Sequence, residues 1–166
     1  MEAPVPASVQ VEPQSTGVSR AVRWRGVSRL AIDPTVLALA LSLTTVGVSL
    51  SLPTLLDSPP CSLCLVQRWL VMTAAAALAL GLLRRSALAA AYALPITIAG
   101  MGVATYHSLL QWGFVPDTLP MCLEGVPCSE VKFMVLGFVT IPFMSACAFT
   151  ALTALLSVSM WRSRNV

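Results

Sequence analysis

Charged side chains are scarce in this sequence, and their scarcity indicates the class of protein. Only 10% of the 166 residues are Asp, Glu, Lys or Arg, whereas 57% are hydrophobic. Because a soluble domain carries about 25% charged residues, an ordinary soluble domain is excluded and a chain that crosses a membrane several times is predicted. The formal net charge of +3 is small, and its distribution indicates membrane topology and not nucleic-acid binding.

The signatures of several other protein classes are also missing. The ten-residue alternating patterns of a membrane β-barrel do not occur. There is no glycine-rich dinucleotide motif, and no C-x-x-C-H haem attachment, because Leu65 follows the C-x-x-C pair. Neither a dinucleotide nor a haem is therefore expected as the electron carrier.

Four long segments with almost no charge are present, and they predict four membrane-spanning helices. Each can supply the roughly 20 apolar residues that a spanning helix needs, and backbone groups in lipid must be satisfied within the segment. We therefore expect an all-α protein, an antiparallel four-helix transmembrane bundle within residues 31–162. The expected spans are 34–56, 62–83, 87–112 and 132–160, between a disordered basic tail at 1–30 and a short tail at 163–166.

Two local signals refine this prediction. Asp33 is expected to cap the first span, with Pro34 at its first helical position. Gly100 and Gly102 are expected to permit close approach of a neighbouring helix to the third span.

The positive charges predict how the bundle is oriented. Eight of the ten basic residues fall on one side of the expected spans, and the positive-inside rule makes that side cytoplasmic. These eight are Arg20, Arg23, Arg25, Arg29, Arg84, Arg85, Arg162 and Arg164. We therefore expect a multi-pass membrane protein with both termini cytoplasmic and the loops around 57–65 and 112–132 extracytoplasmic.

Five cysteines are present, and four of them are predicted on the outer side of the membrane. Cys61 and Cys64 begin the second span, and Cys122 and Cys128 lie in the second outer loop. An oxidising compartment favours disulfides between such residues. Cys147 lies roughly 22 Å along the fourth expected span at 1.5 Å per residue, and we expect it to be a buried small hydrophobe far from the others.

Three interpretations of the four outer cysteines are open: two structural disulfides, a zinc site with four thiolate ligands, or two catalytic redox pairs. The outer location weakens the zinc interpretation, because thiols there do not stay reduced. Pro59 and Pro60 place Cys61 and Cys64 in the first turn of a helix, where unpaired N–H groups and the helix dipole stabilise a thiolate. A structural disulfide has no use for that placement, so the redox interpretation is favoured.

Arg68 shares a helical face with both cysteines, because it lies four residues after Cys64 and seven after Cys61. An ionisable residue this close to the membrane is a functional candidate. Its charge is expected to lower the pKa of the Cys64 thiol and to hold a carbonyl oxygen of an electron acceptor. The alternative is that Arg68 extends to the lipid headgroups.

The membrane itself supplies an acceptor in the form of a lipid-soluble quinone (ubiquinone or menaquinone). The third span brings His107 and Gln111 to the level of Cys64, four residues apart on one face. His107, the only histidine, can donate to a quinone oxygen or transfer a proton. A hydrogen bond between helices is an equally good explanation of this pair.

These motifs together resemble the disulfide bond formation protein B (DsbB) family, membrane quinone oxidoreductases that reoxidise periplasmic thiol oxidases. The resemblance covers roughly residues 34–161, and it implies that the membrane is the bacterial cytoplasmic (inner) membrane. Its most specific element is the Cys61-x-x-Cys64-x-x-x-Arg68 motif at the start of the second span, followed by a cysteine pair in the next outer loop. The segments 106–111 (YHSLLQ) and 137–142 (GFVTIP) are similar to the short-loop, BdbC-like branch of the family.

The resemblance implies a role for each cysteine. Cys61 and Cys64 would be the pair next to the quinone, with Cys64 forming the charge-transfer or adduct species and Arg68 lining the site. Cys122 would form a mixed disulfide with a soluble extracytoplasmic thioredoxin-like (DsbA-like) thiol oxidase. Cys128 would resolve that bond and would transiently bond Cys61. Only five residues separate Cys122 from Cys128, whereas the best-known members have a much longer loop.

We therefore expect a membrane thiol:quinone oxidoreductase that supports disulfide bond formation in other proteins. The reverse direction, a reductase that passes electrons outward, requires a second redox centre on the cytoplasmic side, and no cysteine pair is placed there. The alternative from another class is a small membrane transporter or structural protein that is stapled by disulfides or binds zinc.

Overall fold

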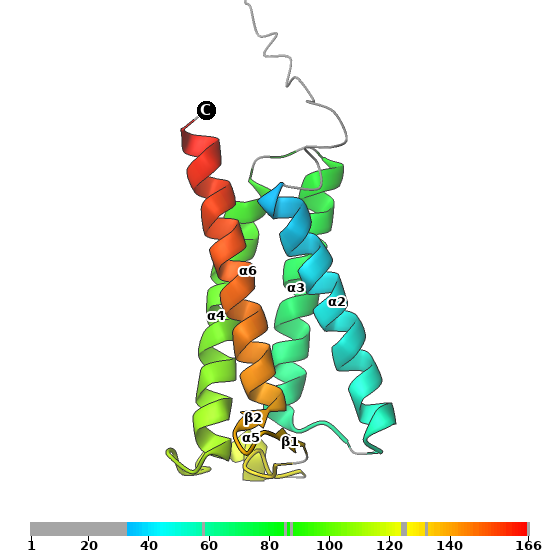
Figure 1. Ribbon diagram of the computed structural model, residues 1–166, viewed down its shortest axis with the longest axis vertical. Coiled ribbons are helices and arrows are strands. Elements are labelled where there is room, and N and C mark those ends of the chain that lie inside the picture. The colour runs from blue at the N-terminus through cyan, green and yellow to red at the C-terminus, as the bar shows by residue number, and fades with distance from the viewer. Residues whose placement is uncertain are drawn as a thin grey trace, which may run out of the picture.

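Four long helices dominate the computed structural model, which describes residues 33–57, 59–84, 86, 88–123, 126–131 and 133–165. They are α2 (Pro34–Leu55), α3 (Ser62–Leu83), α4 (Ala89–Gln111) and α6 (Ile141–Arg164). All four are long and apolar enough to cross a membrane, and they run alternately up and down the bundle (Figure 1). The predicted all-α, antiparallel four-helix transmembrane class is confirmed. The predicted tail at 1–30 lies outside the described residues.

The helices form a closed ring in which α4 packs against α3 and α6, and α2 packs against the same two helices. The core between them is apolar, and its buried members are small or aliphatic residues around one aromatic ring. They include Ala38, Val71, Leu78, Ala93, Leu152, Leu156 and Phe149. Gly100 faces the Phe149 ring so closely that a Cβ would lie 2.3 Å from it. The close approach expected at Gly100 is confirmed, whereas Gly102 faces open space and that expectation was wrong.

The first helix begins as its sequence predicts. The Asp33 side chain accepts a hydrogen bond of 2.8 Å from the Thr35 backbone N–H, and Pro34 occupies the first turn. This cap satisfies one of the N–H groups that the helix start leaves without a partner.

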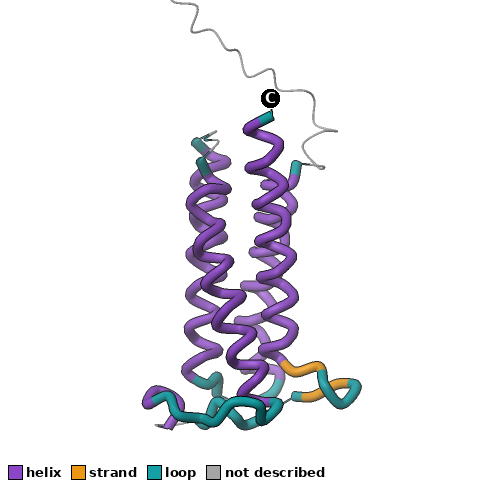
Figure 2. Tube along the Cα trace, turned by 90° about the vertical axis from the view of Figure 1, so that its left-hand side faces the viewer, coloured by secondary structure: helices purple, strands orange, loops and turns teal. Residues whose placement is uncertain are grey.

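The end of the bundle that carries the cysteines also carries the short elements, namely α5 (Pro120–Leu123), β1 (Met134–Val135) and β2 (Val139–Thr140). The two strands pair antiparallel, with Met134 opposite Thr140, and the hairpin projects sideways from the bundle (Figure 2). Gly137 in its turn has φ 77°, a conformation that glycine adopts without strain.

Because this hairpin precedes the last long helix, that helix begins later in the chain than expected. The expected span began at about residue 132, whereas α6 begins at Ile141 and continues to Arg164. Cys147 therefore lies only about 9 Å along α6 at 1.5 Å per residue, and its side chain is exposed on the bundle surface. The expected burial of Cys147 was wrong, because a helix that faces lipid has apolar residues on its outer as well as its inner side.

Candidate active site

The C-x-x-C pair lies where the chain enters α3. Cys61 is the N-cap residue, in extended conformation, and Cys64 lies in the first turn. Their Sγ atoms are 3.0 Å apart, within hydrogen-bond distance. Cys61 is buried and Cys64 is partly exposed. Since a disulfide has an S–S length of about 2.05 Å, a small movement of either side chain is enough to join them.

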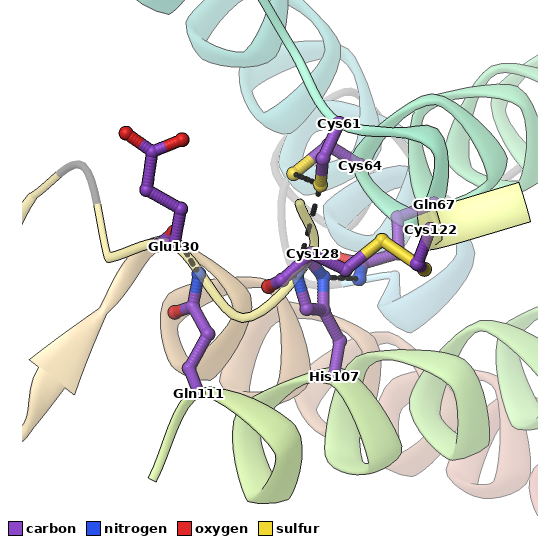
Figure 3. Close-up of a disulfide and its surroundings, with 8 residues drawn as sticks. All are labelled: Cys61, Cys64, Gln67, His107, Gln111, Cys122, Cys128 and Glu130. Atoms are coloured by element: carbon purple, nitrogen blue, oxygen red, sulfur yellow. Dashed lines mark hydrogen bonds between the residues drawn. A yellow bond between two sulfur atoms is a disulfide. The ribbon is translucent and has the colours of Figure 1, made fainter. Parts of the chain in front are cut away.

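The second pair is a disulfide between Cys122 of α5 and Cys128 of the segment that follows. Both cysteines are buried, and they pack in one cluster with Cys61, Leu63 and Leu110. Figure 3 shows this disulfide beside the C-x-x-C pair, with His107 next to both. The structure therefore brings all four outer cysteines together. It does not hold them as a four-thiolate zinc site, because Cys122 and Cys128 are bonded to each other.

His107 of α4 connects the two pairs. Its Nε2 atom lies 3.7 Å from the Cys61 Sγ and 3.2 Å from the Cys128 backbone oxygen. Because a carbonyl oxygen can only accept, Nε2 carries a hydrogen. On the other side of the ring, Nδ1 lies 3.0 Å from the Gln67 side-chain nitrogen. The imidazole is completely buried.

The thiol of Cys61, which precedes α3, is strongly acidic in these surroundings. Hydrogen bonding with the Cys64 thiol is the largest influence, and together with the weaker effect of His107 it outweighs burial and lowers the pKa of Cys61 to about 4. A thiolate, and not a thiol, is the species that attacks a disulfide. Cys61 is therefore prepared for exchange at neutral pH.

A pocket opens beside the C-x-x-C pair, between α2, α3 and α6. Its open space, including the mouth, is about 860 Å³, and its lining is mostly apolar. The polar and sulfur-bearing side chains that line it include Ser49, Cys61, Cys64, Gln67, Arg68, Gln111 and Ser145. His107 is not part of this lining, so the structure does not place it where the expected quinone contact would need it.

Arg68 is held in the pocket by a hydrogen bond to a backbone carbonyl of α2 that lacks its usual partner within its own helix. Pro53 lies inside α2, and since proline has no N–H it cannot bond the carbonyl four residues earlier. That carbonyl belongs to Ser49, and it accepts a hydrogen bond from Nη2 of Arg68 instead. The Arg68 Nε atom is buried, with no hydrogen-bond partner among the described residues. Arg68 thus turns toward α2 and the pocket, and not outward to the headgroups.

Gln111, at the end of α4, also lines the pocket. Its side-chain nitrogen donates to the Glu130 backbone oxygen at 3.1 Å. Its Oε1 atom is buried, and within the described part of the chain it has no hydrogen-bond partner. Gln111 and Arg68 therefore both line the pocket, and each carries one buried polar atom without a hydrogen-bond partner among the described residues.

Gln67 was not predicted from the sequence as a residue of this site. This side chain is 5% exposed, contacts His107 and lines the pocket. A signal was present, since Gln67 is a polar residue in an apolar segment, three residues after Cys64. Polar groups are expensive in a membrane and are retained where they have a partner or a function.

The chain is similar in sequence to proteins that are named for disulfide bond formation. The model of the family described as "Disulfide bond formation protein DsbB" matches residues 33–159. A "Probable disulfide formation protein" of Chlamydia caviae is 39% identical over 105 residues, which are 63% of this chain and 75% of the relative. The "Disulfide bond formation protein C" of Bacillus subtilis is 35% identical over 92 residues, 54% of this chain and 65% of the relative.

A third relative, a "Probable disulfide formation protein C 2" of Bacillus anthracis, is 31% identical over 101 residues, 61% of this chain and 71% of its own length. No solved structure matches the chain.

Proposed function

The chain belongs to the DsbB family of disulfide bond formation proteins, and from this premise we propose that it is a membrane thiol:quinone oxidoreductase. It takes two electrons and two protons from a soluble dithiol protein and delivers them to a quinone. The products are the partner's disulfide and a quinol. The observation that carries the proposal is the packing of two cysteine pairs in one cluster beside an apolar pocket.

Electrons enter at the Cys122–Cys128 disulfide. A thiolate of a thioredoxin-like partner attacks Cys122, and Cys128 leaves as a thiolate. The partner's second thiolate, and not Cys128 as the resemblance implied, then attacks the mixed disulfide and releases Cys122, so the partner leaves oxidised and the loop pair is reduced. Both loop cysteines are buried, so the segment must open to admit the partner. Two hydrogen bonds resist that opening, from His107 to Cys128 and from Gln111 to Glu130.

Transfer between the pairs uses the contact that His107 makes with each. The Cys128 thiolate attacks Cys61 of an oxidised Cys61–Cys64 pair, and Cys64 leaves as a thiolate. Cys122 then attacks Cys128, which restores the loop disulfide and leaves Cys61 reduced. We assign His107 the role of holding the Cys128 segment against Cys61 and stabilising the Cys61 thiolate through Nε2–H. This replaces the quinone contact that its sequence position suggested.

Electrons leave through the pocket. A quinone held there would take up two electrons and two protons. The pocket suits such a ring because its lining is mostly apolar and Cys64 borders it. The unpaired Nε–H of Arg68 can donate to a carbonyl oxygen, and the unpaired Oε1 of Gln111 can accept from a hydroxyl. Cys61 and Cys64 close their disulfide as the electrons depart.

The orientation proposed from the arginines agrees with this division. Arg84 ends α3 and Arg162 and Arg164 lie in the last turn of α6, at the end of the bundle opposite the cysteines (Figure 1). With those arginines in the cytoplasm, the cysteine loops face the extracytoplasmic side, where a soluble thiol oxidase can reach them.

The proposal is tested with the purified protein, a reduced thioredoxin-like dithiol protein and a soluble quinone analogue. Quinone absorbance should fall only when protein and dithiol are both present, and the partner should become oxidised in equal amount. If several such partners give no thiol-dependent loss of quinone, the proposal is wrong. A Cys64→Ala variant serves as the matched negative control.

A further inference from the structure

The reduced C-x-x-C pair and His107 form a group of three potential metal ligands. The Sγ atoms of Cys61 and Cys64 and a ring nitrogen of His107 all lie within 4.8 Å of one another. We propose that this group binds one soft divalent metal ion, Zn²⁺ in particular, and that the bound ion holds the protein in a reduced state that cannot turn over. The inhibitory part rests on the proposed function, whereas the binding site does not.

The distances need little change to fit the ion. Zn–S bonds of about 2.3 Å and Zn–N bonds of about 2.0 Å in a tetrahedral site place two sulfurs about 3.8 Å apart and a sulfur and a nitrogen about 3.5 Å apart. In the structure the Cys61 Sγ lies 3.7 Å from His107 Nε2, and the two sulfurs are 3.0 Å apart. The Cys64 Sγ lies within 4.8 Å of the His107 nitrogen and must come to about 3.5 Å from it, so rotation of the partly exposed Cys64 side chain completes the site. Three protein ligands leave the fourth position open.

Gln67 completes the arrangement on the far side of the imidazole. A histidine that binds metal through one nitrogen almost always donates its other N–H to a neighbouring acceptor. The Gln67 amide lies 3.0 Å from Nδ1, and turning the amide presents its oxygen to that N–H. The ion then takes the place of the Nε2 hydrogen, which otherwise faces Cys61 and the Cys128 carbonyl.

Binding is selective for one redox state. The reaction is two thiols plus Zn²⁺ giving a zinc dithiolate and two protons, with no electron transferred. A Cys61–Cys64 disulfide has no thiolate to offer, so the oxidised protein does not bind. Both sulfurs border the pocket, so the ion has a route to them. While it is bound, neither sulfur can attack a disulfide or reduce a quinone.

Co²⁺ is the probe that tests the binding, because it occupies tetrahedral zinc sites and is coloured. The protein used is full-length Cys122→Ser/Cys128→Ser, reduced and free of reductant, which removes the loop thiols as competing ligands. We expect one Co²⁺ per chain, with a thiolate charge-transfer band and strong visible d–d bands that Zn²⁺ abolishes. No such spectrum, or a spectrum that Cys147→Ala removes, overturns the proposal.

Ligand variants identify the donors. Cys64→Ser and His107→Ala should each weaken Co²⁺ binding at least about tenfold and change the d–d bands, and Gln67→Ala should weaken it about 10–100-fold without changing them. Circular dichroism in detergent identifies variants that have not folded. His107→Gln, which keeps a polar side chain, serves as a second variant if His107→Ala is unfolded. An unchanged spectrum in both histidine variants excludes the imidazole and overturns the site.

Inhibition is measured in a single turnover without the partner. Reduced wild-type protein is mixed with the quinone analogue, with and without one equivalent of Zn²⁺, and a chelator is then added. Quinone reduction should fall at least about tenfold with Zn²⁺ and recover with the chelator. Binding that leaves this rate unchanged overturns the inhibitory role. Failure of the proposed function is distinguishable, because it abolishes quinone reduction without Zn²⁺ and leaves the Co²⁺ spectrum intact.

Discussion

The Cys122–Cys128 pair and the Cys61/Cys64 pair occupy the same end of the bundle but have different neighbours. The first pair is a closed disulfide outside the long helices. The second begins a membrane-spanning helix, and of the two pairs it alone contributes to the described lining of the pocket. His107 touches both (Figure 3). This difference supports the proposed function, in which one pair serves a soluble partner and the other a lipid-soluble acceptor.

Replacement of Cys64 should have the largest effect and should distinguish the functions of the two cysteine pairs. In Cys64→Ala we expect quinone reduction to fall by about a thousandfold or more, because the thiol next to the pocket is gone. Exchange between the loop disulfide and a reduced partner should continue. Stopped-flow quinone absorbance measures the first, and alkylation trapping of the partner's thiols measures the second. Equal loss of both activities would contradict a division of labour.

Loss of the loop pair should give the complementary result. In Cys122→Ser/Cys128→Ser, quinone reduction driven by the protein dithiol should fall about a hundredfold or more. A small dithiol that can reach Cys61 directly should still drive quinone reduction within a fewfold of wild type. The measurement compares the two electron donors in the same assay, and a similar deficit with both donors would show that the loop pair is not the entry point.

Replacement of Arg68 tests whether the pocket beside Cys61 and Cys64 binds the quinone. In Arg68→Met we expect the quinone KM to rise about tenfold, because a charged hydrogen bond in a low-dielectric pocket is worth about 1.5–3 kcal/mol. Arg84→Met, at the opposite end of the bundle, is the matched control and should leave KM unchanged. An unaltered quinone dependence in Arg68→Met would return this residue to a purely structural role at the Ser49 carbonyl.

The acidity of Cys61 predicts an unusual pH profile. Since its pKa is lowered to about 4, the thiolate is present above that value and is lost only as the pH falls through it. Alkylation of Cys61 in the reduced protein should therefore slow by less than about twofold from pH 8 to pH 6, whereas a thiol of pKa near 8.5 slows roughly a hundredfold. His107→Ala should move the midpoint upward. Peptide mapping of the alkylated residue makes the measurement, and a profile like that of an ordinary thiol would contradict the assigned environment.

Cys147 should take no part in the reactions of either cysteine pair. It is exposed on the surface of α6, and its thiol is free. Cys147→Ala should leave turnover within about twofold of wild type and the unfolding free energy within about 0.5 kcal/mol. Turnover with both donors is the measurement, and an inactive variant would mean that a third thiol takes part in electron transfer.

The structural features that depend on residues close together in the chain were predicted correctly from the sequence. Apolar length alone identified four helices, and Asp33 with Pro34 identified the start of one of them. Proximity along one helix turn brought Cys61 and Cys64 together. The hairpin before α6 was not foreseen, because residues 133–140 are as apolar as a span and length counting merges the two.

The contacts that the sequence did not reveal join residues that are far apart in the chain. Gln67 and Cys61 meet His107 across 40 and 46 residues. Arg68 reaches a carbonyl of α2 that is free only because Pro53 lies four residues beyond it. The spacing of hydrophobic residues along the sequence does not indicate such pairings, because in a lipid-facing bundle the outer and inner faces of each helix are both apolar.

By itself, the sequence determined that this chain forms membrane helices with two cysteine pairs and an arginine at one end, because hydropathy and helix starts are local properties. Only the tertiary structure decided that His107 contacts the Cys61 sulfur, that Gln67 contacts His107, and that Arg68 and Gln111 line the pocket with one unpaired polar atom each among the described residues. The physical reason is that buried polar groups must find partners, and which partners they find depends on how distant helices pack.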